Sequence, residues 1–563
     1  MVIMTSQNDS IPAAPPTGRR TRRVVLAVTA GLALVAGSSL FSAPALAYDP
    51  GSFGSHNDAV LTPHTQFTMK PDGSSGLTVG GENIPNSDIV KKTIATYYGD
   101  PGTGIANKES SPYISEMSRI VASMTAALPA EYAKAKRSGK TPAIVLDTDD
   151  TMLETYDYEV GQMHFNFSPT LNNADILAKG FPATPAMVGF EKYARSLGFA
   201  VIGITGRSAT QQAASIENLA NVGYTGFDPS NYYVKWATGA QPSYITCVTA
   251  TCTTVEYKAG TRKHLENDLG YDIALSVGDQ WSDLQGGFAD RIQKLPNPTY
   301  YLPSPDLPGF SEPQLSARTH FTMKADGSSG LTQGGEGIPN IDSVKSTIAV
   351  YYGDAGTGTS NKTASPYISE MQRIVKTEAP RVAAACFIDK KLHRNPAIVL
   401  DADDTTLWTY DMEVGAMHFV FDPTLQDFWV QNQLFPAVPS MTNLAAIAQK
   451  AGCTVVGLTG RNDNQKAATL ANLTKVGYPE FTAANYYTKW TGVGTSQQPS
   501  YITCAVAGKC TTIEYKSQTR AHVESVSGGK YDIVANFGDQ FSDLIGGHAA
   551  LDVKLPNPTY YLP

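Results

Sequence analysis

A run of four apolar residues that ends abruptly in acids constrains the fold of this chain more than any other feature. Residues 143–151 read Ala-Ile-Val-Leu-Asp-Thr-Asp-Asp-Thr, and residues 397–405 repeat them with one change. A short apolar run bounded by polar residues is typical of a buried strand in a parallel sheet. Acids placed directly after such a strand lie at the sheet edge where α/β proteins bind ligands. We therefore expect a ligand site there.

The acidic cluster predicts a bound cation. Three carboxylates in four residues repel one another unless a cation joins them, and a hard cation such as Mg²⁺ prefers oxygen ligands. A solvated acidic turn is the first alternative, but a buried strand leads into both copies. A calcium loop of the EF-hand type is the second. It requires Gly at its sixth position and Glu at its twelfth, where this chain has Met152 and Tyr158.

The chain is an internal duplication. Residues 67–70 recur as residues 321–324, and both acidic clusters keep the same offset. A unit of this length is too long for a solenoid repeat, so it predicts tandem domains. The expected boundaries are a signal peptide at 1–47, a first domain at 48–303, a Pro-rich linker at 304–317 and a second domain at 318–563.

The N-terminus predicts export. Four arginines between residues 19 and 23 precede an apolar run at residues 24–40, and residues 45–47 give a small-x-small cleavage site. Residues 21–26 also resemble a twin-arginine signal, which leaves both export routes open. An uncleaved anchor is the alternative, and no later stretch is long enough to cross a membrane. We expect a secreted, periplasmic or cell-surface protein.

Charge and cysteine spacing agree with that expectation. The net charge of −8 over 563 residues argues against nucleic-acid binding through general basicity. Neither close cysteine pair has the spacing of a zinc knuckle, so disulfides at Cys247–Cys252 and Cys504–Cys510 are favoured. Each would close a short loop and contribute only about 2 kcal/mol. Cys386 and Cys453 occur in the second repeat alone, and either a pair or two buried thiols fits the sequence.

Strands alternate with helices through each repeat. Ser111 and Pro112 predict a helix start, residues 185–197 a helix ending at Gly198, and residues 200–204 and 273–277 two further strands. Another helix should turn Ala213, Ile216 and Ala220 inward. This alternation predicts an α/β protein with a doubly wound, Rossmann-like parallel sheet in each repeat.

Polar residues recur where the strands end, so they should meet in one crevice per repeat. Carboxylates that hold a cation, combined with Thr and Lys donors, suit a phosphoryl group. One carboxylate facing the phosphorus can act as a nucleophile, and a second can act as a general acid. These residues are Asp147, Asp149, Thr205, Lys258, Asp279 and Asp283 in the first repeat, and Asp401, Asp403, Thr459, Lys516, Asp539 and Asp543 in the second.

Four motifs in order resemble the haloacid dehalogenase (HAD) superfamily. They are Asp-x-Asp-x-Thr after a strand, Thr-Gly-Arg after the next, Tyr-Lys before a helix, and Gly-Asp-Gln-(Trp/Phe)-Ser-Asp after the last strand. The chain is similar to the secreted acid phosphatase branch, which includes plant vegetative storage proteins. The resemblance covers most of both repeats from Ser111 onward.

The resemblance implies a role for each motif residue. The nucleophiles would be Asp147 and Asp401, and the general acids or bases Asp149 and Asp403. Phosphate would be bound by Thr205, Gly206, Lys258, Thr459, Gly460 and Lys516. Mg²⁺ would be held by Asp147, Asp149, Asp279, Asp283, Asp401, Asp403, Asp539 and Asp543, with the second acid of each first motif contributing its backbone carbonyl.

Several assignments stay open. Arg207 and Arg461 either touch substrate or form structural salt bridges. Lys235 and Lys489 are rival lysines, ranked below the Tyr-Lys pairs. The branch usually has Glu where this chain has Asp150 and Asp404, which puts the contacts of that side chain in doubt.

Each repeat carries a modest insertion between its first two motifs, which predicts a small cap and an open site. Only 58 residues separate Asp147 from Thr205. The insertion holds aromatic side chains that either stack on a substrate ring or pack the cap onto the core. His164 is a proton donor, a substrate contact or a packed residue. These positions are Tyr156, His164, Phe165 and Phe167, matched by Tyr410, His418, Phe419 and Phe421.

The predicted function is an exported, Mg²⁺-dependent acid phosphatase that hydrolyses small-molecule phosphate monoesters, nucleotides among the candidates, at two active sites. A non-catalytic storage or binding protein on the same fold is one alternative, but both nucleophiles are present. A phosphotransferase would use the same residues. We expect no nucleic-acid partner, no stable membrane span, and two sites that share no residue. The sequence does not determine the oligomeric state.

Overall fold

The computed structural model describes residues 66–69, 76–79, 85–236, 240–302, 320–323, 330–333, 338–525 and 530–562. The predicted signal peptide at 1–47 and the predicted linker at 304–317 lie outside these ranges.

Two five-stranded sheets, one in each repeat, form the framework, and every strand pair in them is parallel. The acid-bearing strand is central in both, which confirms the predicted doubly wound α/β fold. In spatial order the first sheet is β5 (Tyr232–Lys235), β4 (Ala200–Ser208), β3 (Thr141–Leu146), β6 (Tyr271–Gly278) and β7 (Ile292–Lys294). The second is β12 (Tyr486–Lys489), β11 (Thr454–Asn462), β10 (Asn395–Leu400), β13 (Tyr531–Gly538) and β14 (Asp552–Lys554).

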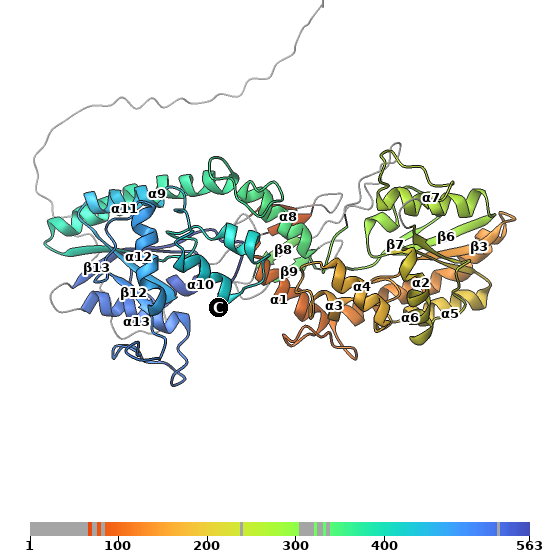
Figure 1. The fold of residues 1–563 in the computed structure, drawn as a ribbon, viewed down its shortest axis with the longest axis horizontal. Coiled ribbons are helices and arrows are strands. Elements are labelled where there is room, and N and C mark those ends of the chain that lie inside the picture. The colour runs from red at the N-terminus through yellow and green to blue at the C-terminus, as the bar shows by residue number, and fades with distance from the viewer. Residues whose placement is uncertain are drawn as a thin grey trace, which may run out of the picture. The chain divides into compact units, whose positions relative to one another are not determined.

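Helices cover both faces of each sheet (Figure 1). In the second repeat, α9 and α11 pack on one face of the sheet and α13 packs on the other. In the first repeat, α2 and α5 pack on one face and α7 packs on the other. The first-repeat helices are α1 (Ser87–Tyr98), α2 (Pro112–Lys136), α3 (Tyr156–Glu159), α4 (Pro169–Ala178), α5 (Met187–Leu197), α6 (Gln212–Asn221), α7 (Thr254–Asn267), and the short η2 (Ala209–Gln211) and η3 (Trp281–Asp283). The second-repeat helices are α8 (Ile341–Tyr352), α9 (Pro366–Lys391), α10 (Pro423–Gln431), α11 (Met441–Lys450), α12 (Lys466–Lys475), α13 (Thr512–Ser525), α14 (Phe541–Leu544), and the short η5 (Asp411–Ala416) and η6 (Asp463–Gln465).

Local chemistry sets the helix ends that the sequence predicts. The Ser111 hydroxyl accepts a hydrogen bond from the Ile114 N–H at the start of α2. Pro112 suits the first turn because it has no N–H group, and an N–H there would have no partner within the helix. Gly198 ends α5 in the left-handed conformation at φ 101°, which glycine adopts without steric cost. Both predictions are confirmed. The apolar strand before Asp147 is also buried, since residues 143–146 are at most 3% exposed.

The predicted inward face of α6 is confirmed only at Ile216, which is half-buried against the core. Ala213 and Ala220 are exposed, and the buried positions are Ser215, Asn218 and Leu219. The reason is that this face makes polar contacts. The Asn218 side chain bonds both backbone groups of one cap residue, and Ser215 accepts from an arginine of the site. A pattern of apolar residues cannot reveal a helix face buried through hydrogen bonds.

The two repeats share structure at their N-terminal elements. Strand β1 (Gln66–Met69) pairs with β2 (Gly76–Val79) and, antiparallel, with β8 (His320–Met323) of the second repeat, which pairs with β9 (Gly330–Gln333). Helix α1 packs against α8, and the Ser87 hydroxyl donates to the Thr559 carbonyl. Each repeat thus supplies a helix that contacts the other repeat.

All six cysteines lie among the described residues and are paired. The disulfides are Cys247–Cys252, Cys504–Cys510 and Cys386–Cys453. The two local pairs agree with prediction, and the third resolves the choice that the sequence left open. No helix in the described part of the chain is both long and apolar enough to cross a membrane.

Candidate active sites

Asp147 stands at the first turn beyond the central strand, where a buried lysine meets it. Its backbone N–H donates to the Val277 carbonyl at 3.1 Å, which extends the sheet by one residue. The Lys258 ammonium lies 2.6 Å from Asp147 Oδ1 and also contacts the Asp283 carboxylate. All three side chains are at most 8% exposed. In the second repeat Lys516 makes the same two contacts, at 2.7 Å to Asp401 Oδ1 and to Asp543.

Three carboxylates converge in each repeat in a way that fits a hard cation. Asp147, Asp279 and Asp283 each offer an oxygen, and these atoms lie within 4.8 Å of one another; Asp401, Asp539 and Asp543 match them. All are buried, and oxygen-only donors at this spacing suit Mg²⁺ better than a softer metal. The Asp149 and Asp403 side chains do not join these clusters. The resemblance assigns metal binding at these two positions to the backbone carbonyls.

Burial and mutual repulsion raise the pKa of the clustered acids. Burial, followed by the Asp283 charge, raises the pKa of Asp279 to about 6. The same two causes, with Asp543 in place of Asp283, raise the pKa of Asp539 to about 8. Burial also raises the pKa of Asp147, against the opposing charge of Lys258. A divalent cation would favour the ionised form of each acid.

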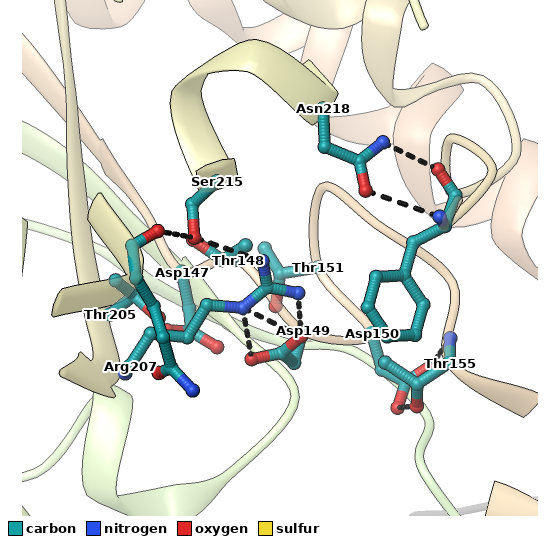
Figure 2. Close-up of polar contacts among 12 residues, drawn as sticks. Asp147, Thr148, Asp149, Asp150, Thr151, Thr155, Thr205, Arg207, Ser215 and Asn218 are labelled. Atoms are coloured by element: carbon teal, nitrogen blue, oxygen red, sulfur yellow. Dashed lines mark hydrogen bonds and ion pairs between the residues drawn. The ribbon is translucent and has the colours of Figure 1, made fainter. Parts of the chain in front are cut away.

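Asp149 is held by an arginine rather than by the carboxylate cluster (Figure 2). The Arg207 guanidinium points at the Asp149 carboxylate, with Nη2 at 2.5 Å from Oδ1 and Nε at 3.1 Å from Oδ2. Arg207 also donates to the Ser215 hydroxyl at 3.0 Å. Burial lowers the pKa of Arg207, but the Asp149 charge more than compensates and raises it overall. Of the two open roles for Arg207, the salt bridge is the one present.

The other motif residues lie where two strands end. Thr205 is fully buried near the end of β4, and its hydroxyl accepts the Arg207 N–H at 3.2 Å. Gly206 is exposed beside it, and in the second repeat Gly460 lines the site cavity. Lys235 instead donates to the Cys252 carbonyl at 3.5 Å. The lysine that contacts both carboxylates is thus the one ranked first.

Asp150 replaces the expected Glu yet keeps a full set of donors. It sits in the left-handed region at φ 50°, which Asp tolerates better than most residues. Its carboxylate accepts the Thr155 N–H at 3.0 Å, the Thr155 hydroxyl, and the Asn297 amide at 3.3 Å. The shorter side chain therefore does not leave this position unbonded.

The sequence reasoning missed the segment that orients Asp279. Asn297 donates to Asp279 Oδ2 at 2.7 Å, and the Tyr300 hydroxyl donates to the same atom at 3.2 Å. Asn557 does the same for Asp539 at 2.7 Å. A signal was available, because Leu-Pro-Asn-Pro-Thr-Tyr-Tyr-Leu-Pro occurs at both 295–303 and 555–563. We call residues 297–302 and 557–562 the tails of the first and second sheets.

The second site opens into a cavity of about 790 Å³. Amide side chains from the cap and from the loop after β11 line it, together with Phe419 and Phe421. Its inner wall carries the predicted catalytic set: Asp401, Asp403, Gly460, Lys516, Asp539 and Asp543. A cavity of this size accommodates a small phosphate ester.

The cap aromatics divide between packing and exposure. Tyr156 and Phe165 are buried and pack against the core. Phe167 is 63% exposed and Phe421 is 67% exposed, and the half-buried Phe419 lines the cavity, so substrate stacking stays open for these three. His164 is exposed, so it is not a packed residue.

A family model covers both repeats. It is described as HAD superfamily, subfamily IIIB (Acid phosphatase), and it matches residues 73–303 and 355–563, well over half of the chain. The chain belongs to this family. The two matched regions each contain one complete carboxylate cluster, which agrees with the duplication.

Relatives of the chain include an acid phosphatase and a vegetative storage protein. The chain is 32% identical to the stem 28 kDa glycoprotein of Glycine max over 178 residues, 31% of this chain and 63% of that protein. It is 34% identical to acid phosphatase 1 of Solanum lycopersicum over 170 residues, 29% and 58% respectively. Vegetative storage protein 1 of Arabidopsis thaliana is 29% identical over 163 residues, 28% and 55%. The chain thus spans less than two thirds of the length of these relatives.

Among solved structures, the class C acid phosphatase from Bacillus anthracis matches 38% of this chain and 86% of its own. The identity is 21% and the TM-score is 0.28.

Proposed function

We propose that this protein is an exported phosphomonoesterase that uses Asp147 and Asp401 as nucleophiles at two active sites. The observation that carries the proposal is the buried lysine bridging two acids of the cluster, at 2.6 Å in the first repeat and 2.7 Å in the second. A cation placed between a nucleophilic carboxylate and a second acid is suited to neutralising a bound phosphoryl group. The family and the relative named acid phosphatase 1 support the same reaction.

The chemistry proceeds in two displacements. An Asp147 oxygen attacks phosphorus, the ester P–O bond breaks, and the leaving alkoxide takes a proton from Asp149. Water, giving its proton to Asp149, then attacks the aspartyl phosphate, and inorganic phosphate leaves with Asp147 restored. Lys258 neutralises the charge on the attacked group, and Thr205 and Gly206 bind its oxygens. Arg207 orients the Asp149 carboxylate throughout.

The carboxylate clusters fit Mg²⁺, which would be held by Asp147, Asp279 and Asp283 with the Asp149 backbone carbonyl. When bound, Mg²⁺ would offset the repulsion between the acids and the phosphate oxygens. The second repeat offers Asp401, Asp539, Asp543 and the Asp403 carbonyl for the same purpose.

A panel of phosphate esters, from aryl phosphates to nucleotides and sugar phosphates, tests the proposal. Wild-type protein should release inorganic phosphate in the presence of Mg²⁺, and the Asp147→Asn/Asp401→Asn variant should not. A storage protein would release none in either form. Adding an alcohol acceptor separates a transferase from a hydrolase, because transfer lowers the yield of free phosphate per ester consumed. We expect hydrolysis to dominate.

A further inference from the structure

Helix α1 of the first repeat begins on the tail of the second sheet. Asn86 caps the helix, and its oxygen accepts the Asp88 and Ile89 N–H groups. Its amide Nδ2 meanwhile donates to the Asn557 carbonyl at 3.0 Å and to the Tyr560 carbonyl. Asn86 is only 3% exposed, so these bonds are made out of contact with water.

Helix α8 of the second repeat makes the reciprocal contact. Asn340 caps α8 in the same way, and its Nδ2 donates to the Asn297 carbonyl at 3.0 Å and to the Tyr300 carbonyl. The Ile341 N–H donates to the Pro298 carbonyl at 2.9 Å. The same bonds therefore form twice, each time from one repeat to the other.

The tail that receives these bonds is the segment that holds the acidic cluster. Asn297 and Tyr300 offer their carbonyls to Asn340 of the other repeat and their side chains to Asp279. Asn340 is therefore two hydrogen bonds away from a carboxylate of the first site, although it belongs to the second repeat. Asn86 has the same relation to Asp539 through Asn557.

The same helices also fasten the caps. The Lys345 ammonium donates to the Phe165 carbonyl and to Asp342 at 3.3 Å. Phe165 and the preceding His164 both have positive φ, at 61° and 51°, a conformation that non-glycine residues keep only when neighbours impose it. Lys91 makes the matching contact with Phe419 in the second cap.

An acid of each helix accepts a hydrogen bond from the tail of the other repeat. Asp88 accepts the Tyr561 N–H at 3.1 Å and lines the cavity that holds Asp401 and Asp403. Asp342 accepts the Tyr301 N–H at 3.2 Å at the matching place in the first repeat.

We propose that each active site is completed by the first helix of the other repeat: α8 positions the tail and cap of the first site, and α1 those of the second. Asn340 and Asn86 are positioning residues that act through the tails on Asp279 and Asp539. The assignment of those acids to a phosphatase rests on the proposed function, whereas the crossing of the helices does not.

The test exploits a substitution that keeps the helix cap and removes the crossing bonds. Asp caps helices as well as Asn does, but Asn340→Asp exchanges the two amide donors for an oxygen that repels the carbonyls of the first tail. Hydrogen exchange of the full-length protein, read by mass spectrometry, should show tail 297–302 exchanging about fivefold to tenfold faster, since a hydrogen bond of ordinary strength is lost. Tail 557–562 should be unchanged. Asn86→Asp, the matched control, should give the opposite pattern.

Kinetics in single-site backgrounds provide the second arm. With Asp401→Asn present, only the first site turns over, and Asn340→Asp should raise the Mg²⁺ concentration for half-maximal activity about tenfold, as is typical when the support of a metal ligand is lost. Asn86→Asp should leave that concentration unchanged. With Asp147→Asn present, the two variants should exchange roles.

The two arms separate the two proposals. Three outcomes overturn the proposal that each helix positions the tail of the other repeat. They are faster exchange only in the tail of the substituted repeat, equally faster exchange in both tails, and no change in either tail. The expected exchange pattern in a protein without phosphatase activity sustains the crossing and overturns only the proposed function.

Discussion

Lys108 and Lys362 occupy the same place in the two repeats. Each pairs with the matching aspartate, Asp157 at 3.0 Å or Asp411 at 2.9 Å, but their second partners differ. The Lys108 ammonium lies 2.6 Å from the buried Glu154 carboxylate, whereas the Lys362 ammonium lies 4.0 Å from the centre of the Trp408 ring. The lysine–carboxylate bridges at Asp147 and Asp401 differ by only 0.1 Å between repeats. The repeats have therefore diverged around these clusters while retaining the groups to which we assign the chemistry.

The difference extends to the caps. Helix α10 carries Phe428 and Trp429 where α4 has Ala174 and Asp175. Phe428 is 55% exposed, and Trp429 packs on Phe435 with ring centroids 5.7 Å apart. Two sites with the same catalytic groups and different caps predict the same chemistry on different substrates.

The largest expected effect comes from removing both nucleophiles. Asp147→Asn/Asp401→Asn should lower kcat on an aryl phosphate at least about a thousandfold, as loss of a nucleophile does in other enzymes. Each single variant should keep the activity of its intact site, so the two should sum to the wild-type rate at saturating substrate. Asp290→Asn, an exposed acid outside the sites, is the control. Loss of all activity in either single variant would show that the sites are not catalytically separate.

Removing the metal should act on both repeats alike. Dialysis against EDTA should lower turnover at least about a hundredfold, because the acids then repel the phosphate without a cation to offset them. Mg²⁺ should restore it. Retention of full activity after exhaustive chelation would contradict the assignment of both clusters.

Substitution of Lys258 should lower kcat far more than substitution of Lys235. In the Asp401→Asn background, Lys258→Met leaves Asp147 and Asp283 without their shared cation, and we expect kcat to fall about a hundredfold. Lys235→Met removes only a bond to a backbone carbonyl and should change kcat less than about threefold. Circular dichroism checks that both variants fold. Equal losses of kcat would mean that Lys235 is again a candidate for the phosphate-binding lysine.

The raised acid pKa values predict a pH-dependent stability that the metal suppresses. A carboxyl group whose pKa is raised in the folded state does not reduce the free energy of unfolding while it is protonated. As the pH rises from the unfolded-state pKa, about 4, to the folded-state pKa, the group increasingly destabilises the fold. Without metal, the melting temperature should therefore fall between pH 4 and about 6 because of Asp279, and on to about 8 because of Asp539. Asp539→Asn should remove the upper part of that slope, and Mg²⁺ should flatten all of it. A metal-free melting temperature that rises over this range would refute the assignment.

The smallest effect tests the pair that opened this comparison. Both variants lose an ion pair with the matching aspartate, Asp157 or Asp411. Lys108→Met also leaves the buried Glu154 without its cation and should cost about 1 kcal/mol more than Lys362→Met, which also loses a cation–π contact. Burial raises the pKa of Glu154 and Lys108 opposes it, so the extra loss should shrink as pH falls and Glu154 takes up a proton. Urea unfolding at two pH values measures both. An equal cost for the two variants would mean that the partners are interchangeable.

The sheet and its carboxylates could be predicted because they are written in consecutive residues. Strand β3 runs straight into Asp147, so the pattern that identifies the strand also places the acid. The α6 face could not be predicted, since Ser215 and Asn218 are buried through hydrogen bonds to Arg207 and to the cap residue Phe181. The segment repeated at 295–303 and 555–563 could have drawn attention to the tails, but not to their role, because Asn297 and Tyr300 approach Asp279 only once the sheet has formed.

The crossing of α1 and α8 was beyond the sequence for a different reason. An apolar stripe shows that a helix packs against something. It does not show which repeat the helix contacts, because two similar repeats offer two similar surfaces. Tyr98 stacks on Tyr156 of its own repeat with centroids 4.2 Å apart, while Asn86, at the other end of α1, bonds the second tail. Helix α1 therefore contacts both repeats at once, and no local sequence pattern predicts such a contact.

Trapping the covalent intermediate tests the central claim most directly. Acid quenching during turnover, followed by reduction of the acyl phosphate with borohydride and peptide mass spectrometry, marks each aspartate that carried a phosphoryl group. We predict labelling at Asp147 and Asp401 in the wild type, at Asp401 alone in Asp147→Asn, at Asp147 alone in Asp401→Asn, and at neither in the double variant. Turnover without label at either aspartate, or label on another residue, would contradict it.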